Sequence, residues 1–290
     1  MVTGPRALHP PALDLSRPDA ELRPICAAAL QSLTPALEVL NHGCEQRLRE
    51  MAAAAQHTIT RDADGPPPPQ QAHDLDGSLA PDAEALRGCL RRVGLRVLGL
   101  ALGVDEPSLV ASLGADELDL EGRLCIRAYA GSVDAASSPP PPTQRLGAHC
   151  DSVLLTLLWS DAPGLEVLDP VAASEWTPEA VLSYGLPTMG DASEPAMLRD
   201  DQWARIELDW AKQPLLFTVG TSWLRHPLTT ARAPARCAAL HRVCVPTTAA
   251  TPRHSLPFLA DLVPRSSSAA RRDSEAGDFQ GGAPAMAPVS

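Results

Sequence analysis

The first hundred residues carry hydrophobic positions at helical spacing, whereas the rest of the chain carries them in short strand-like runs. Helices are predicted over 19–33, 45–56 and 83–102, from apolar periodicity or from a high content of helix-forming residues. In the last of these, one apolar face is predicted to be buried, formed by Leu86, Leu90, Val93, Val97 and Leu98. The stretch 62–71 contains four consecutive prolines and is predicted to be an exposed, polyproline-like loop.

Strand signals dominate from residue 118 onward. Residues 118–129 are predicted to form a hairpin that turns at Glu121 and Gly122. The Leu-rich run 153–159 is predicted to be a strand that ends in a turn at 161–164. Further strands are predicted at 39–43, 165–168, 215–219, 237–245 and 254–259. Helices followed by many short strands indicate an α+β protein whose second half is a barrel or a sandwich.

Charge and hydropathy exclude two classes of partner. The chain has 24 basic and 35 acidic residues, a net charge of −11, which repels a phosphate backbone. Its dense basic stretch, 265–272, lies in a Ser- and Ala-rich tail, 265–290, that is predicted to be disordered. No apolar run approaches the roughly 18 residues that cross a bilayer. Neither nucleic acid nor a membrane is therefore expected as a partner.

The cysteines and the start of the chain indicate the compartment. The first residues lack the apolar segment of a secretory signal. Seven cysteines form an odd set without CxxC spacing, which argues against a disulfide framework or a zinc ribbon. Reduced thiols in an intracellular, cytoplasmic protein are expected.

Candidate chemistry begins at His149-Cys150-Asp151. On a strand, residues i and i+2 point to the same face, so His149 and Asp151 can present a nitrogen and an oxygen to one metal ion. His241, on a neighbouring strand, would complete a set of two histidines and one carboxylate, which suits non-haem Fe(II) enzymes that activate O₂. Arg253 and Ser255 repeat the same spacing and could bind a carboxylate.

The order of these motifs resembles the isopenicillin-N-synthase-like branch of the 2-oxoglutarate/Fe(II)-dependent dioxygenases. The metal strand of that family resembles 146–158, and the hairpin after it resembles Pro163-Gly164-Leu165-Glu166-Val167. Its distal-histidine strand resembles Leu240-His241-Arg242-Val243, and its co-substrate strand resembles 253–258. Leu13-Asp14-Leu15-Ser16 and Asn41-His42-Gly43 resemble its N-terminal region, so the resemblance spans about residues 12–264.

The resemblance implies a double-stranded β-helix (jelly-roll) core with N-terminal helices. Iron would be bound by His149, Asp151 and His241, and 2-oxoglutarate by Arg253 and Ser255, with Tyr129 touching the co-substrate. O₂ would be consumed, succinate and CO₂ released, and a small organic molecule oxidised, by hydroxylation. The chain is expected to be a monomer, with an N-terminal region over 1–115 and the oxygenase jelly roll over 116–264. Walls of an aliphatic substrate pocket are expected at Leu165, Val167 and Phe258.

The chain also departs from the family pattern. The interval between Asp151 and His241 is longer than usual, and 170–213 is predicted to be an insertion. Arg127 stands where the family has the asparagine companion of the tyrosine. Thr221 follows Gly220 where the family commonly has aspartate. These changes affect substrate recognition and leave the ligand set intact.

Other interpretations stay open at this point. His226 is a rival second histidine ligand, although Pro227 fits poorly in a central strand. His42, His254 and Cys150 are assigned structural roles, the last two because they alternate away from the site. For the whole chain, the alternatives are a catalytically silent jelly roll that binds metal or a partner, and a cupin-like zinc or iron protein that uses no oxoacid.

Overall fold

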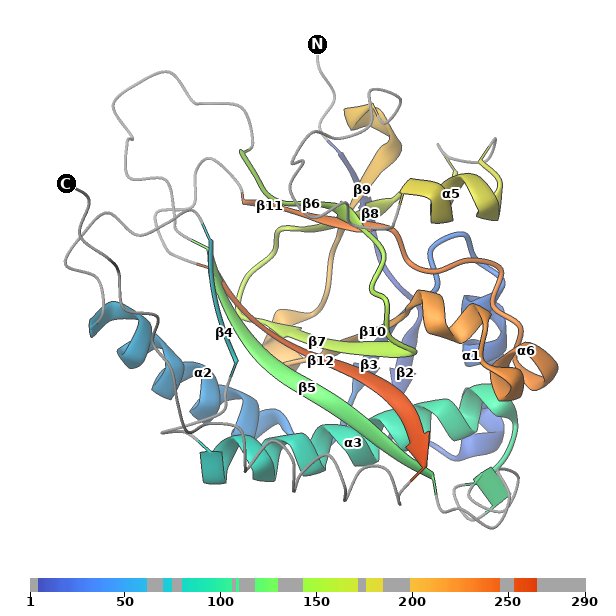
Figure 1. Cartoon of the computed structure of the whole chain (residues 1–290), viewed down its shortest axis with the longest axis horizontal. Helices are drawn as coiled ribbons and strands as arrows, with labels where there is room; N and C mark the ends of the chain where they lie inside the picture. Colours follow the sequence, from blue (N-terminus) through green and yellow to red (C-terminus); the bar gives the residue numbers. More distant parts are fainter. Residues whose placement is uncertain are drawn as a thin grey trace, which may run out of the picture.

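Two β-sheets form the centre of the computed structural model, which describes residues 5–61, 70–74, 80–105, 108–109, 118–129, 143–171, 176–184, 199–245 and 253–264 (Figure 1). The larger sheet has the order β2 (Ala12–Asp14), β3 (Ala36–Leu40), β10 (Leu215–Val219), β7 (Leu155–Ser160), β12 (Arg253–Pro264), β5 (Leu118–Tyr129), β4 (Gln70–Asp74). The smaller has the order β1 (Arg6–Leu8), β9 (Trp203–Ile206), β8 (Leu165–Leu168), β11 (His241–Val245), β6 (Thr143–His149).

The inner faces of the two sheets pack against each other. Ala36 and Leu216 of the larger sheet share one apolar cluster with Leu165, Val167 and Val243 of the smaller sheet. Most neighbouring strands run antiparallel, and the parallel pairs are β1 with β9 and β2 with β3. A two-sheet core with helices confirms the predicted α+β class.

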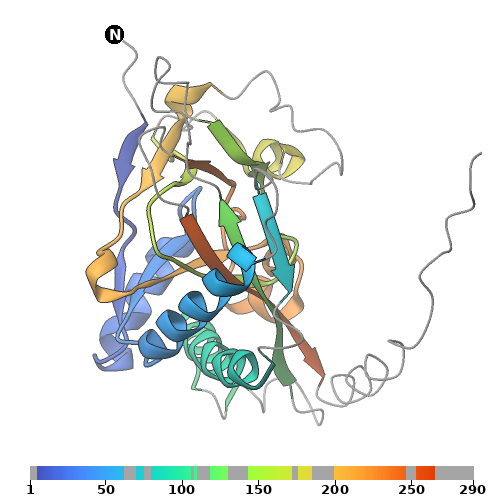
Figure 2. The same cartoon turned by 90° about the vertical axis from the view of Figure 1, so that its left-hand side faces the viewer.

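The three N-terminal helices cover the outer face of the larger sheet. The described helices are α1 (Asp19–Leu30), α2 (Glu45–Arg61), α3 (Ala80–Leu102), α5 (Pro178–Tyr184) and α6 (Pro227–Arg232). Short 3₁₀ turns occupy Asp200–Gln202, Trp210–Lys212 and Thr221–Leu224. Both α2 and α3 lie along the same side of the strands in two perpendicular views (Figures 1 and 2).

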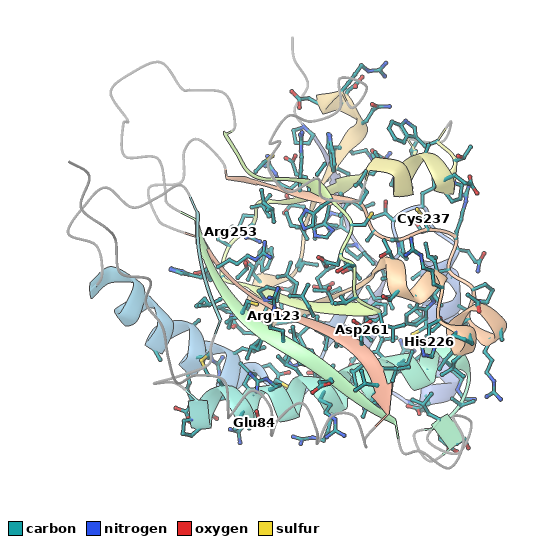
Figure 3. The ribbon with its side chains drawn as sticks, in the orientation of Figure 1. Glu84, Arg123, His226, Cys237, Arg253 and Asp261 are labelled. Carbon is teal, nitrogen blue, oxygen red and sulfur yellow. A yellow bond between two sulfur atoms is a disulfide. The ribbon has the colours of Figure 1, made fainter. Side chains whose placement is uncertain are left out.

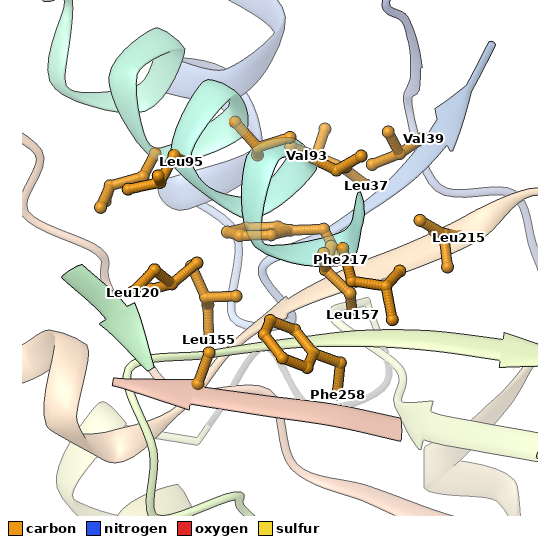
Figure 4. Packing of buried hydrophobic residues seen from close by; sticks show 14 of the residues in the cluster. Leu37, Val39, Val93, Leu95, Leu120, Leu155, Leu157, Leu215, Phe217 and Phe258 are labelled. Atoms are coloured by element: carbon orange, nitrogen blue, oxygen red, sulfur yellow. The ribbon is translucent and has the colours of Figure 1, made fainter. Parts of the chain in front are cut away.

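The main hydrophobic core lies between α3 and this sheet. The five positions predicted for the buried face of α3 are all buried, which confirms that periodicity. Against them lie side chains of the outer sheet face, including Leu155, Leu157, Phe217 and Phe258 (Figure 4). The cluster runs from Leu13 to Leu262, so the N-terminal helices and the β-sheet share one core. The predicted boundary at residue 115 stays a prediction.

Residues 118–129 form one strand and not a hairpin. β5 pairs with β12 along its whole length, and Gly122 lies opposite Ala260 in the middle of this ladder. A Cβ on Gly122 would lie 2.4 Å from the Phe258 ring. The glycine that suggested a turn therefore makes room for an aromatic ring, which is a known reason for glycine inside a strand.

Two segments predicted to lie in an insertion and in a loop form strands of the sheets instead. Residues 203–206, inside the predicted insertion 170–213, form β9, which lies between β1 and β8. That part of the range belongs to the smaller sheet because its backbone pairs on both edges. Gln70 and Gln71, predicted within a proline loop, begin β4, which pairs with β5. Residues 62–69 and the tail 265–290 lie outside the described residues.

One pair of cysteines departs from the expected reduced state. Cys44 and Cys89 form a disulfide between the start of α2 and the middle of α3, with 6.1 Å between their Cα atoms. Sequence spacing could not predict this pair, because packing of two helices brings the cysteines together. Five other cysteines are buried and form no disulfide: Cys26, Cys125, Cys150, Cys237 and Cys244. None of the described helices is both long and apolar enough to span a bilayer.

Gly122→Ala should destabilise the protein by about 1–3 kcal/mol, because the added methyl group overpacks the buried Phe258 ring. Urea unfolding measures this cost. Gly88→Ala is the matched control, since a Cβ there meets nothing within 4 Å, and alanine within a helix is expected to stabilise by up to about 1 kcal/mol. In a Phe258→Leu background the cost at Gly122 should shrink, and an unchanged cost would refute the contact.

Candidate functional site

Three predicted ligands converge at the junction of β6 and β11. His149 ends β6, Asp151 follows it by two residues, and His241 begins β11 directly opposite His149. The carboxylate Oδ1 of Asp151 lies 3.7 Å from Nε2 of His149 and 3.9 Å from Nε2 of His241. Their candidate ligand atoms all lie within 4.8 Å of one another, and no other such group occurs among the described residues.

Backbone carbonyls orient both imidazole rings in the same way. Nδ1 of His149 lies 2.8 Å from the carbonyl oxygen of Gly147, and Nδ1 of His241 lies 3.0 Å from that of Ala239. In a neutral ring, Nδ1 then donates to the carbonyl and Nε2 keeps its lone pair. Both lone pairs are thus available on the side where the Asp151 carboxylate lies.

Asp151 is held at its carboxylate by β7 and at its backbone carbonyl by the turn that follows β10. Thr156 Oγ1 donates a 2.6 Å hydrogen bond to Asp151 Oδ2, which leaves Oδ1 facing the imidazoles. The amide of Thr221 donates to the backbone carbonyl of Asp151 at 2.8 Å, a contact that needs no particular side chain. Gly220 allows this approach, since a Cβ there would lie 2.0 Å from the carbonyl oxygen of Val153.

Electrostatics favour the metal-binding forms of His149 and Asp151. Burial, with a contribution from His241, lowers the pKa of His149 to about 4, so its ring is neutral near pH 7. Burial would raise the pKa of Asp151, but His241, His149 and the Thr156 hydrogen bond lower it below 3.8. A cation would therefore displace no proton from either group at neutral pH.

This donor set fits a divalent first-row metal ion. Two imidazole nitrogens and one carboxylate oxygen lie close enough together to bind one ion. The remaining Nδ1 and Oδ2 atoms of these side chains are hydrogen-bonded to other protein groups. Such an arrangement leaves coordination positions open for other molecules, which is typical of sites that bind non-haem Fe(II).

A cleft between the two sheets opens onto the triad. Its described lining is Arg127, Leu146, His149, Asp151, Thr156, Leu158, Leu165, His241, Val243, Arg253, Ser255, Pro257 and Leu259. The three candidate metal ligands lie on or next to β6 and β11 of the smaller sheet. Arg127 and Arg253 lie on β5 and β12 of the larger sheet.

Arg253 and Ser255 both face this cleft, as their spacing predicts. Each is 2% exposed. The Nε atom of Arg253 donates to the carbonyl oxygen of Ala162 at 3.1 Å, which fixes the guanidinium against the turn before β8. Gly164 in that turn has φ +131°, and a Cβ would lie 3.3 Å from the Arg253 side chain. The turn therefore shapes the arginine pocket.

The other predicted pocket residues divide between the cleft and the core. Leu165 lines the cleft and also packs in the apolar cluster between the sheets, whereas Val167 packs in that cluster and is not among the described lining residues. Phe258 was expected at the pocket wall and lies in the helix-side core, because it alternates with Pro257 and Leu259, which do line the cleft. The backbone of Tyr129 pairs with Arg253, and its side chain is outside the described set.

His226, the rival ligand, and the residues assigned structural roles lie in other surroundings. His226 caps α6 by accepting a hydrogen bond from the Leu228 amide, and Figure 3 shows it beside Asp261, away from Arg253. His254 pairs with Asp161 at 2.7 Å. His42 Nε2 lies 2.9 Å from the Gln213 carbonyl oxygen, and Cys150 is buried in a separate apolar cluster. These placements agree with the structural roles expected for His42, His254 and Cys150.

Sequence reasoning missed the roles of two cleft residues. Thr156 is the one polar residue in the Leu-rich run 153–159, and this pattern could have marked it as a candidate. In the structure it is buried and bonded to Asp151. Arg127 was noted only as a departure from the family pattern. It lines the cleft, and its charge contributes to lowering the pKa of both His149 and Asp151.

Solved structures share this fold. No protein-family model and no curated protein matches the sequence. A full-length Neurospora crassa protein in complex with alpha-KG superposes with a TM-score of 0.58 at 13% identity, over 90% of this chain and 88% of that one. JOX2 in complex with 2OG, Fe and JA gives 0.55 at 17% identity, over 92% and 78%. A Shewanella oneidensis protein gives 0.57 at 15% identity, over 92% and 99%.

At these identities the similarity is one of fold. The chain has the jelly-roll fold of 2-oxoglutarate/Fe(II)-dependent oxygenases, which confirms the fold that the motif resemblance implied.

Thr156→Val should weaken Fe(II) binding by about 10–100-fold, because it removes the hydrogen bond that orients Asp151. Anaerobic titration with Fe(II) measures the affinity. Thr218→Val is the matched control, since Thr218 is also buried and pairs with Thr156 on the next strand but does not line the cleft. Equal affinities for the two variants would contradict this role.

Metal-free protein should lose stability as the pH falls from 6.5 to about 4, with His149 carrying part of the loss. Between these values the unfolded chain binds a proton that the buried imidazole does not, so stability falls as the pH falls. Urea unfolding across this range should give a steeper dependence for wild type than for His149→Gln. Parallel curves would show that His149 is not the titrating group.

Proposed function

We propose that this chain is a non-haem Fe(II)- and 2-oxoglutarate-dependent dioxygenase that hydroxylates a small organic molecule and releases succinate and CO₂. The observation that carries the proposal is the His149, Asp151 and His241 triad, which opens onto a cleft that also contains Arg253 and Ser255. A metal triad alone fits several classes of protein, and the buried arginine supplies the feature that an oxoacid requires.

Each side chain has a defined part in this proposal. His149, Asp151 and His241 hold the iron, and Thr156 orients the carboxylate. Arg253 and Ser255 bind the distal carboxylate of 2-oxoglutarate, with Tyr129 beside them. Bound iron and 2-oxoglutarate supply the oxidising power for C–H oxidation by O₂. The remaining cleft walls exclude water and hold the substrate near the metal.

Structures with the same fold support the choice of co-substrate. The Neurospora crassa protein is described in complex with alpha-KG, and JOX2 in complex with 2OG, Fe and JA. A small-molecule substrate agrees with the size of these ligands and with the aliphatic walls of the cleft. The two alternatives, a silent jelly roll and a metal protein without an oxoacid, gain no specific support from the described residues. Monomeric state and cytoplasmic location stay predictions.

Anaerobic addition of Fe(II) and then 2-oxoglutarate should produce a visible metal-to-ligand charge-transfer band. His149→Ala should abolish the band, because it removes a ligand. Arg253→Ala should weaken 2-oxoglutarate binding by about 10–100-fold, through loss of a charged hydrogen-bond donor. Absorption titration measures both effects.

His226→Ala is the control for the first variant, since it removes a histidine that lies away from the triad. It should keep the band. A well-folded wild type without the band would favour the silent jelly roll, and an Arg253→Ala protein with normal affinity would favour a metal protein that uses no oxoacid.

A further inference from the structure

Arg127 places a second guanidinium in the cleft. It lies on β5 in register with Ser255 of β12, and therefore on the same sheet face as Ser255 and Arg253. It lines the cleft together with His149 and Asp151. The co-substrate role proposed above uses Arg253 and leaves Arg127 without an assignment.

The described residues around Arg127 include no acid that pairs with it. Asp151 is the single acidic residue in the described lining, and its oxygens are directed to Thr156 and to the two imidazoles. The Nε atom of Arg127 is buried and has no hydrogen-bond partner among the described residues. Buried donors of this kind usually bind a ligand or water, because leaving them unpaired costs free energy.

Formal charge in the loaded cleft points to the sign of the missing ligand. A divalent ion and the described lining, which has two guanidiniums and one carboxylate, together carry three positive charges when both imidazoles are neutral. Dianionic 2-oxoglutarate balances two of them. One positive charge remains, and a cleft with low dielectric disfavours an unbalanced charge.

The apolar lining residues indicate the chemical character of the uncharged part of that ligand. Six apolar side chains contribute, Leu146, Leu158, Leu165, Val243, Pro257 and Leu259. All of them are aliphatic, so they offer no aromatic stacking surface and no hydrogen bonds from their side chains.

We propose that Arg127 binds the carboxylate of the primary substrate, and that this substrate is a small aliphatic monocarboxylate. This inference rests on the proposed function and names the substrate class for the same cleft. A guanidinium can bind a carboxylate through two parallel hydrogen bonds, which fixes orientation as well as position. The aliphatic chain would then lie against the apolar walls, at a set distance from the metal side of the cleft. Arg127 is thus a specificity-determining residue.

The test uses protein loaded anaerobically with Fe(II) and saturating 2-oxoglutarate. The probes are butanoate, hexanoate and octanoate, each compared with its uncharged primary amide of nearly the same shape. Binding is followed by the change in the charge-transfer band and by the shift in melting temperature. Wild type should bind at least one carboxylate about tenfold or more tightly than its amide, as expected for charged hydrogen bonds.

Arg127→Asn should lose this preference while keeping the band and the affinity for 2-oxoglutarate. Arg127→Lys, which keeps the charge but lacks the planar fork, should show a reduced preference and serves if the Asn variant does not fold. Arg123→Asn is the matched control. Arg123 is an exposed arginine of β5 (Figure 3), four residues before Arg127 and so on the same strand face. It is not among the described lining residues of the cleft, and its loss should change nothing in these assays.

Three outcomes overturn the proposal while the proposed function stands. In the first, wild type shows the band but prefers none of the carboxylates. In the second, Arg127→Asn keeps the full preference. In the third, Arg127→Asn weakens 2-oxoglutarate binding as much as Arg253→Ala, which would assign Arg127 to the co-substrate. Absence of the band in wild type would instead overturn the proposed function and this inference together.

Discussion

The cleft depends on one cross-strand pairing, in which His241 lies directly opposite His149. Each imidazole is oriented by the carbonyl two residues before it, at Gly147 and Ala239, so both rings use the same local geometry. Pairing of the strands then brings two free Nε2 atoms and the Asp151 carboxylate together. The site thus depends on two local hydrogen bonds, one for each imidazole, and on the long-range pairing of β6 with β11.

A buried ion pair on the opposite sheet face specifies the register of β11 against its other neighbour, β8. Arg242 donates to Glu166 at 2.8 Å, lies opposite it in register, and its guanidinium lies 4.4 Å from the Trp203 ring centroid. A slip of one residue would turn Arg242 into the cleft and His241 out of it, because side chains alternate along a strand. Arg242 and Glu166 therefore help to keep His241 on the cleft face of β11.

In the larger sheet, alternate residues of one strand face the cleft and the hydrophobic core under the helices. On β12, Arg253 and Ser255 face the cleft, whereas Leu256 and Phe258 pack against the helix side. Because the helix-side residues are closely packed, the cleft-side residues are held on a rigid support. This division gives the cleft a metal side from one sheet and a cationic side from the other.

Local patterns in the sequence determined the three long helices α1, α2 and α3, the buried face of α3, the spacing of His149 with Asp151 and the spacing of Arg253 with Ser255. Each of these follows from the period of a helix or a strand, which neighbouring residues define. The tertiary structure alone decided that Gly122 accommodates Phe258, that 203–206 join the smaller sheet and that Cys44 reaches Cys89. It also decided that Thr156 holds Asp151 and that Arg127 faces the triad. These contacts join residues whose partners are chosen by packing and strand pairing, and no local period encodes such a choice.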